Sequence, residues 1–176
     1  VRPRPVAKRS DSLAKNPPKE AAALFEAGQN EHQKGDLAKA IELYSEALKQ
    51  DPDLWQAEYQ RANAYFTLNK LPEAKASILR VEDLLKQFPD SPELKQISAR
   101  VQLTSGEIAL ADANPADAEK AFRRVLEIDP RVSRAHSGLA EILLSAKKYD
   151  EAIVEGKAAL AAGDDRAATW LLLGIA

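Results

Sequence analysis

Apolar and polar positions alternate with a helical period over most of the chain. Between residues 37 and 50, apolar side chains at positions 37, 40, 41, 44, 47 and 48 lie on one stripe of an α-helix. Asp51-Pro52 ends this predicted helix, because proline cannot continue a helix and disfavours helical geometry in the residue before it. A partner helix is predicted over residues 19–34, with Lys34-Gly35-Asp36 as the turn between the two.

This helical pair recurs along the chain. The pattern of residues 21–54 returns after 34 residues at Trp55 and again at Ser133 and Ala167, and another copy is displaced by 10 inserted residues to Ala99. A period of this size is typical of stacked repeat arrays. We therefore predict repeats over 21–54, 55–90, 91–132 and 133–166, and the first helix of a fifth over 167–176.

Two of the predicted helices are longer than their counterparts. The second helix of the 55–90 repeat keeps its apolar stripe through Phe88 and is expected to run on to Pro89. Ser91-Pro92 offers a cap and a first-turn proline for the next helix, which is expected to span about 20 residues. The resulting long hairpin is either a partner or dimer surface or a merely lengthened repeat.

Small and bulky residues recur where two packed helices need them. The small residues on the first helices are Gly28, Ala62, Gly106, Ala140 and Gly174, and those on the second helices are Ala40, Ala74, Ala118 and Ala152. Bulky side chains follow four residues after three of these alanines, at Tyr44, Ile78 and Phe122. The spacing resembles the tetratricopeptide repeat, which it matches literally at Trp170, Leu173-Gly174 and Asp129-Pro130. This resemblance implies an all-α fold, a right-handed superhelical solenoid of antiparallel helix pairs (an alpha-alpha superhelix) over residues 19–176.

Composition fits a soluble globular protein, with 45% apolar and 30% charged residues. The net charge of −2 conceals a basic start, because residues 1–20 carry +4 and the remainder −6. Residues 1–18 contain four prolines and little to bury, so we expect a disordered linker there, with a proline-rich ligand or a basic clamp on an acidic surface as alternatives. No stretch is apolar enough for a membrane span. Because the chain starts at Val1 and contains no Met, we interpret it as part of a longer protein, of cytoplasmic or periplasmic location.

No catalytic or metal-binding pattern is found. The chain has no cysteine, and its two histidines, His32 and His136, lie far apart without a paired ligand motif. His136 and Ser137 are neighbours on a predicted helix, where successive side chains point about 100° apart, so they do not suggest a triad. No glycine-rich phosphate loop occurs. We predict that this domain is not an enzyme and uses no cofactor or metal.

The resemblance implies that the first helix of each repeat lines a concave face. The peptide-binding groove predicted in this way is lined by Phe25, Gln29, His32, Gln56, Tyr59, Asn63, Phe66, Arg100, Leu103, Glu107, Arg134 and Glu141, with Ala22 and Gln33 also facing inward. The alternative is a solvated groove whose aromatic residues pack within the protein. Tetratricopeptide co-chaperones that hold the acidic C-terminus of heat-shock chaperones use two lysines, two asparagines and an arginine on this face. The corresponding positions here are Phe25, Gln29, Gln60, Arg100 and Thr104, so that carboxylate clamp is not expected.

The predicted function is that of a protein–protein interaction scaffold or adaptor, binding a peptide or a partner domain in the groove. The alternative is an accessory domain of a larger enzyme or of a secretion or assembly machine, which positions substrate or mediates self-association. Homo-oligomer formation would use the uncapped last helix, through Trp170, Leu171, Leu172 and Ile175. Binding of nucleic acid by the basic segment is the least favoured possibility, and we predict no nucleic-acid partner.

Overall fold

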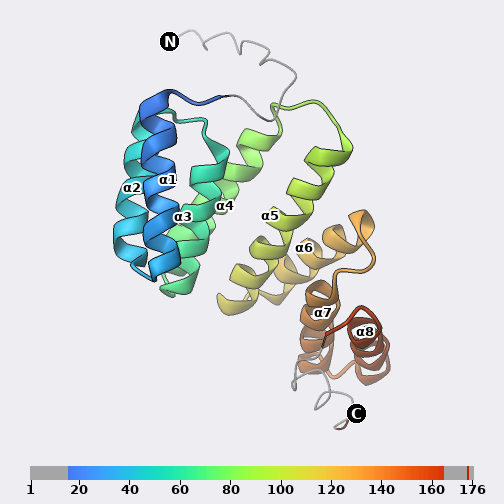
Figure 1. Cartoon of the computed structure of the whole chain (residues 1–176). Helices are drawn as coiled ribbons and strands as arrows, with labels where there is room; N and C mark the ends of the chain where they lie inside the picture. Colours follow the sequence, from blue (N-terminus) through green and yellow to red (C-terminus); the bar gives the residue numbers. More distant parts are fainter. Residues whose placement is uncertain (1–15, 165–173, 175–176) are drawn as a thin grey trace, which may run out of the picture. The chain divides into compact units, whose positions relative to one another are not determined.

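The computed structural model describes residues 16–164 and 174, and within these it contains eight α-helices and no strand (Figure 1). The helices are α1 (Lys19–Lys34), α2 (Leu37–Gln50), α3 (Trp55–Thr67), α4 (Leu71–Leu85), α5 (Pro92–Ala111), α6 (Pro115–Ile128), α7 (Ser133–Ser145) and α8 (Tyr149–Ala161). The all-α prediction is confirmed. The first two helices begin and end at the residues that the sequence predicted.

The helices belong to two compact units, residues 1–95 and 96–176, which divide within the first turn of α5. In unit 1, α1 packs on α2, α2 on α3 and α3 on α4. In unit 2, α6 packs on α7 and α7 on α8, while α5 contacts α6 through Gly106 and Phe122. Each unit is thus built from consecutive helices joined by short turns.

The turns follow from local chemistry. Gly35 ends α1 in the left-handed conformation at φ 86°, which glycine adopts without a steric penalty. Asp36 then caps α2, because its carboxylate accepts a hydrogen bond from the backbone N–H of Lys39 at 3.0 Å. Asn114 caps α6 in the same way, through the backbone N–H of Asp117 at 3.3 Å.

The predicted extension of α4 to Phe88 is wrong, whereas the predicted 20 residues of α5 are observed. Helix α4 ends at Leu85, where the backbone N–H groups of Gln87 and Phe88 bond to carbonyls three residues back, at 3.3 and 3.1 Å. Bonds of this tighter kind are common at helix ends, and Pro89 accounts for the non-helical Phe88, because proline disfavours helical geometry in the residue before it. The apolar stripe therefore continues beyond the helix itself.

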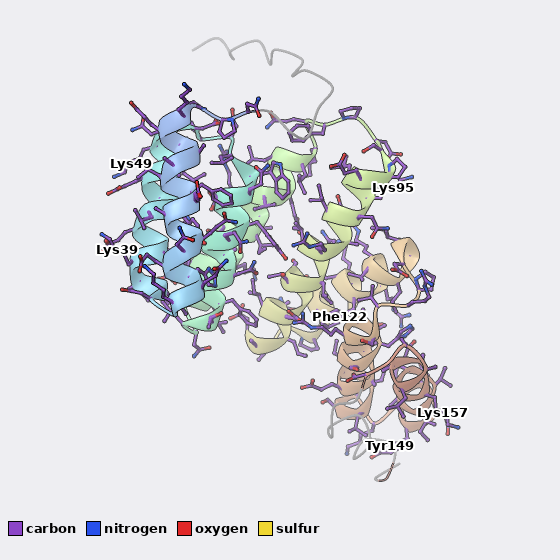
Figure 2. The ribbon with its side chains drawn as sticks, viewed as in Figure 1. Lys39, Lys49, Lys95, Phe122, Tyr149 and Lys157 are labelled. Atoms are coloured by element: carbon purple, nitrogen blue, oxygen red, sulfur yellow. The ribbon has the colours of Figure 1, made fainter. Side chains whose placement is uncertain are left out.

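Glycine–aromatic contacts build the core of each unit. In unit 1, a Cβ atom placed on Gly28 would lie 2.6 Å from the Tyr44 ring, so only glycine leaves room for that ring. In unit 2, the buried ring of Phe122 (labelled in Figure 2) lies against Gly106 at one edge and against Gly138 at the other. The small and bulky positions of the repeat pattern are therefore paired in space.

Several predictions concern residues outside the described ranges. These are the fifth-repeat helix, the self-association residues Trp170, Leu171, Leu172 and Ile175, and most of the basic segment 1–18. Among the described helices, none has the length and apolar character needed to cross a membrane.

Candidate functional site: a polar pocket between the first and third helices

A pocket of about 150 Å³ opens in unit 1, and its lining residues are Gln29, His32, Gln33, Tyr44 and Gln60. His32 and Gln33 lie three and four residues after Gln29, so both neighbour it on one face of α1. Gln60 comes from α3, and Tyr44 comes from α2. Three consecutive helices therefore contribute to this site, which we call the amide pocket.

Tyr44 is a rigid part of this pocket. Its side chain is 0% exposed, and its ring lies against Gly28 and at a centroid distance of 5.9 Å from the Phe25 ring. The Tyr44 hydroxyl lies 3.3 Å from Nδ1 of His32. Burial raises the pKa of Tyr44 to about 12, so the phenol stays protonated and able to donate near neutral pH. The polar end of a core residue thus reaches the pocket.

The remaining chemistry of the pocket is uncharged and amide-rich. Gln29, Gln33 and Gln60 each offer one carbonyl acceptor and two N–H donors. None of the five lining residues is a Lys, Arg, Asp or Glu. The pocket can therefore donate to and accept from a neutral polar group, but it contains no fixed charge to pair with an ion.

The predicted groove residue Phe25, on α1, packs against the hydrophobic cluster of unit 1 and the Tyr44 ring. The remaining predicted groove residues of unit 1 form a stripe on α3. Gln56, Tyr59, Asn63 and Phe66 are spaced by three and four residues, and all four are half-buried. Helix α3 contacts α1, and Gln60 lies on α3 beside this stripe. Unit 1 therefore presents aromatic and amide side chains on α1 and α3; that they bind a peptide stays a prediction.

The predicted residues of unit 2 are placed differently. Arg134 on α7 forms an ion pair with Glu107 on α5, so these two charges neutralise each other. Leu103 packs against the hydrophobic cluster around Phe122. Arg100 and Glu141 are exposed. Part of the predicted set in this unit thus contributes to its internal packing.

Sequence reasoning did not assign Tyr44 or Gln60 to the site. The repeat pattern predicts Tyr44 as a core residue, and Gln60 corresponds only to a carboxylate-clamp position that lacks the required side chain. A signal for Tyr44 existed, because a buried tyrosine usually directs its hydroxyl to a polar partner. Identifying His32 as that partner requires the packing of α1 on α2.

His136, in unit 2, is held in a structural arrangement. Its Nδ1 lies 2.7 Å from Oε2 of Glu155, and its Nε2 lies 3.0 Å from the carbonyl oxygen of Pro130. Over the described residues, no group of three or more His, Asp or Glu side chains is arranged to hold a metal ion.

Consecutive antiparallel helix pairs that present such a face define a helical-repeat protein–protein interaction module. Family models agree with this class: a TPR repeat model matches residues 28–69 and a tetratricopeptide repeat model matches residues 103–167. The chain belongs to the tetratricopeptide repeat family.

Comparison with individual proteins supports the same fold. The chain is 28% identical over 134 residues to Protein CTR9 homolog of Arabidopsis thaliana, an alignment that covers 73% of this chain and 11% of that protein. Among solved structures, MamA protein superposes with a TM-score of 0.75 at 18% identity, covering 89% of this chain and 80% of that one. The first TPR of Spaghetti (RPAP3), bound to the HSP90 peptide SRMEEVD, superposes with a TM-score of 0.64 at 25% identity, covering 73% and 94%. The chain therefore has the tetratricopeptide superhelix fold, and it spans only 11 to 17% of the curated relatives that it matches.

Proposed function

We propose that this chain is a scaffold or adaptor module whose unit 1 binds an extended segment of a partner protein on the face formed by α1 and α3. The observation that carries the proposal is the amide pocket, with the half-buried stripe of Gln56, Tyr59, Asn63 and Phe66 on the adjacent helix. Amide side chains match the donors and acceptors of a peptide backbone, and aromatic side chains supply contact area at low entropic cost.

The size of the pocket favours a peptide over a small-molecule ligand. Small-molecule sites enclose about 300–1,000 Å³, whereas the amide pocket has about 150 Å³. A volume of this size suits a single side chain, with the rest of the ligand lying along α1 and α3. A peptide bound in an extended conformation has this form.

The similar Spaghetti structure is bound to an acidic peptide of HSP90. For this chain we expect a different ligand. The five positions that correspond to the carboxylate clamp of tetratricopeptide co-chaperones include only one basic residue, Arg100. The SRMEEVD peptide is therefore a suitable negative control in binding experiments.

The test is a selection of peptides from a random phage-displayed library on the immobilised chain, followed by affinity measurement in solution. Gln29→Ala and Asn63→Ala are expected to weaken the selected peptides at least tenfold, which corresponds to about 1.4 kcal/mol each. The matched control is Lys49→Ala, because Lys49 is exposed on α2 (labelled in Figure 2) and does not line the amide pocket. Equal effects of all three substitutions, or none at Gln29 and Asn63, would refute the proposal.

The second candidate is an accessory domain of a larger enzyme or assembly machine. It is favoured by the length of the curated relatives, of which this chain spans less than one fifth. The sequence of the complete protein tests the enzyme version, because a catalytic domain in the same polypeptide supports it and the absence of one contradicts it. Purification of the complete protein in a stable complex would support the assembly version, and a monomeric complete protein would contradict it.

A further inference from the structure

The amide pocket differs from a carboxylate-binding site in its charge. The charged side chains nearest to it along α1 and α3 are engaged elsewhere. Lys34 bonds to Glu31 at 2.7 Å, and the largely buried Arg61 bonds to Glu58 at 2.6 Å. Arg61 also donates to the hydroxyl of Ser45 at 3.2 Å.

An acidic ligand group would therefore enter the pocket without a cationic partner. Removing a carboxylate from water without pairing it is strongly unfavourable, because its hydration is lost and no opposite charge replaces it. The same reasoning disfavours a lysine or arginine side chain, since no Asp or Glu lines the pocket. The absence of charge in the lining thus disfavours both a free C-terminus and an ionised side chain.

Hydrogen bonding selects among the neutral groups that remain. Three glutamine amides from two helices, the His32 imidazole and the protonated Tyr44 hydroxyl surround one small volume. The Tyr44 hydroxyl and the His32 imidazole already contact each other at 3.3 Å, but a purely apolar side chain would offer no partner to the glutamine amides. An amide side chain both donates and accepts, so it is the neutral group that this lining satisfies most completely.

We propose, on the basis of the function proposed above, that the amide pocket receives an asparagine or glutamine side chain from an uncharged internal segment of the partner protein. Gln29 and Gln60 bind the two ends of the inserted amide from opposite helices. The partner needs no free C-terminus. Because no ion pair is formed at this position, the affinity depends little on salt.

The test compares two phage libraries on the full chain, one with random peptides linked at both ends and one with free C-termini. The doubly linked library is expected to yield binders with a recurrent Asn or Gln. Replacing that residue by Asp or Leu in a synthetic peptide is expected to lower affinity at least tenfold. Raising NaCl from 50 to 500 mM is expected to change affinity less than twofold.

A variant that introduces a positive charge into the pocket makes the test more stringent. Gln60→Lys places a cation in the pocket and is expected to reverse the preference, so that the Asp peptide binds at least tenfold more tightly than the Asn peptide. Circular dichroism and thermal unfolding of the variant confirm that it folds, and Gln60→Met at the same position is the uncharged control.

The outcomes separate this inference from the proposed function. Binders that need a free carboxylate, or that tolerate Asp in place of Asn, refute the proposed preference for an amide side chain. They leave the proposed peptide binding by unit 1 intact. A failure of both libraries to yield binders sensitive to Gln29→Ala overturns the inference and the proposed function together.

Discussion

Replacing Gly138 by alanine tests the packing around Phe122 directly. A Cβ atom at position 138 would meet the Phe122 ring and would lie 2.6 Å from its Cζ atom, closer than real Cβ atoms approach. The ring has no room to move toward α5, because its other edge already fills the space beside Gly106. A Cβ atom placed on Gly106 would lie 2.6 Å from the Cε1 atom of Phe122. Phe122 is therefore confined from two sides by helices that carry glycine at the contact.

Two opposing effects set the magnitude. Overpacking a well-packed core costs about 1–3 kcal/mol, whereas alanine is about 1 kcal/mol more favourable than glycine within a helix. The confined ring places the cost at the upper end, so we expect Gly138→Ala to lower the free energy of unfolding by about 2 kcal/mol. For a chain of this length that corresponds to a decrease in Tm of about 4–8 °C.

Urea unfolding followed by circular dichroism at 222 nm measures this change. Phe122→Leu removes the edge of the ring, and combining it with Gly138→Ala should cost at least 1 kcal/mol less than the sum of the single changes. Additive free energies in this cycle, or a Gly138→Ala variant as stable as the parent, would show that the contact does not limit packing.

Three further predictions concern other positions. Burial raises the pKa of Tyr44 to about 12 from an ordinary value of 10, because it disfavours the ionised phenolate in the folded state. The fold should therefore keep its full stability below pH 10 and lose stability as the pH rises from 10 to 12. Tyr44→Phe should remove this part of the alkaline destabilisation in urea titrations, and an unchanged pH profile would contradict it. Glu155→Ala should lower the free energy of unfolding by about 1.5–3 kcal/mol, because His136 loses the carboxylate that lies 2.7 Å from its Nδ1 atom. This loss should largely vanish in a His136→Ala background, and equal losses in both backgrounds would show that the two side chains do not interact. Gly35→Ala should lower the free energy of unfolding by about 1 kcal/mol through backbone strain alone, because φ is 86° and no atom lies within 4 Å of the added methyl group. An unchanged Tm in thermal unfolding would argue against backbone strain at this position.

The repeat architecture could be predicted because its determinants are local. Gly35, Asp36 and Pro52 act within a few residues of themselves, and they fix the ends of α1 and α2 where the sequence placed them. The end of α4 could not be predicted in this way. Its apolar stripe continues to Phe88, and the conformation of that residue depends on the competition between burial and the following Pro89.

The site could be predicted only in part, because its chemistry depends on partners from other helices. Gln29 and His32 follow from helical spacing and the repeat resemblance, and both line the pocket. The pairing of Arg134 with Glu107 joins α7 to α5, and nothing in the local sequence of either residue indicates it. A predicted ligand contact and an internal ion pair thus look the same until the helices are packed.

Gly28 connects the repeat pattern to the amide pocket and provides the last prediction. The Tyr44 ring lies against Gly28, and the hydroxyl of the same ring lies 3.3 Å from His32 in the pocket. A methyl group at position 28 must displace the ring, so Gly28→Ala should alter the pocket as well as the core. We expect a loss of stability of up to about 2 kcal/mol, together with shifted side-chain amide NMR signals of the pocket glutamines. Gly106→Ala is the matched control. A Cβ atom at position 106 would also lie 2.6 Å from an aromatic ring, that of Phe122, but this contact belongs to unit 2. If Gly106→Ala shifts the glutamine amide signals as much as Gly28→Ala does, or if Gly28→Ala leaves these signals unchanged, then the packing of Tyr44 does not position the pocket.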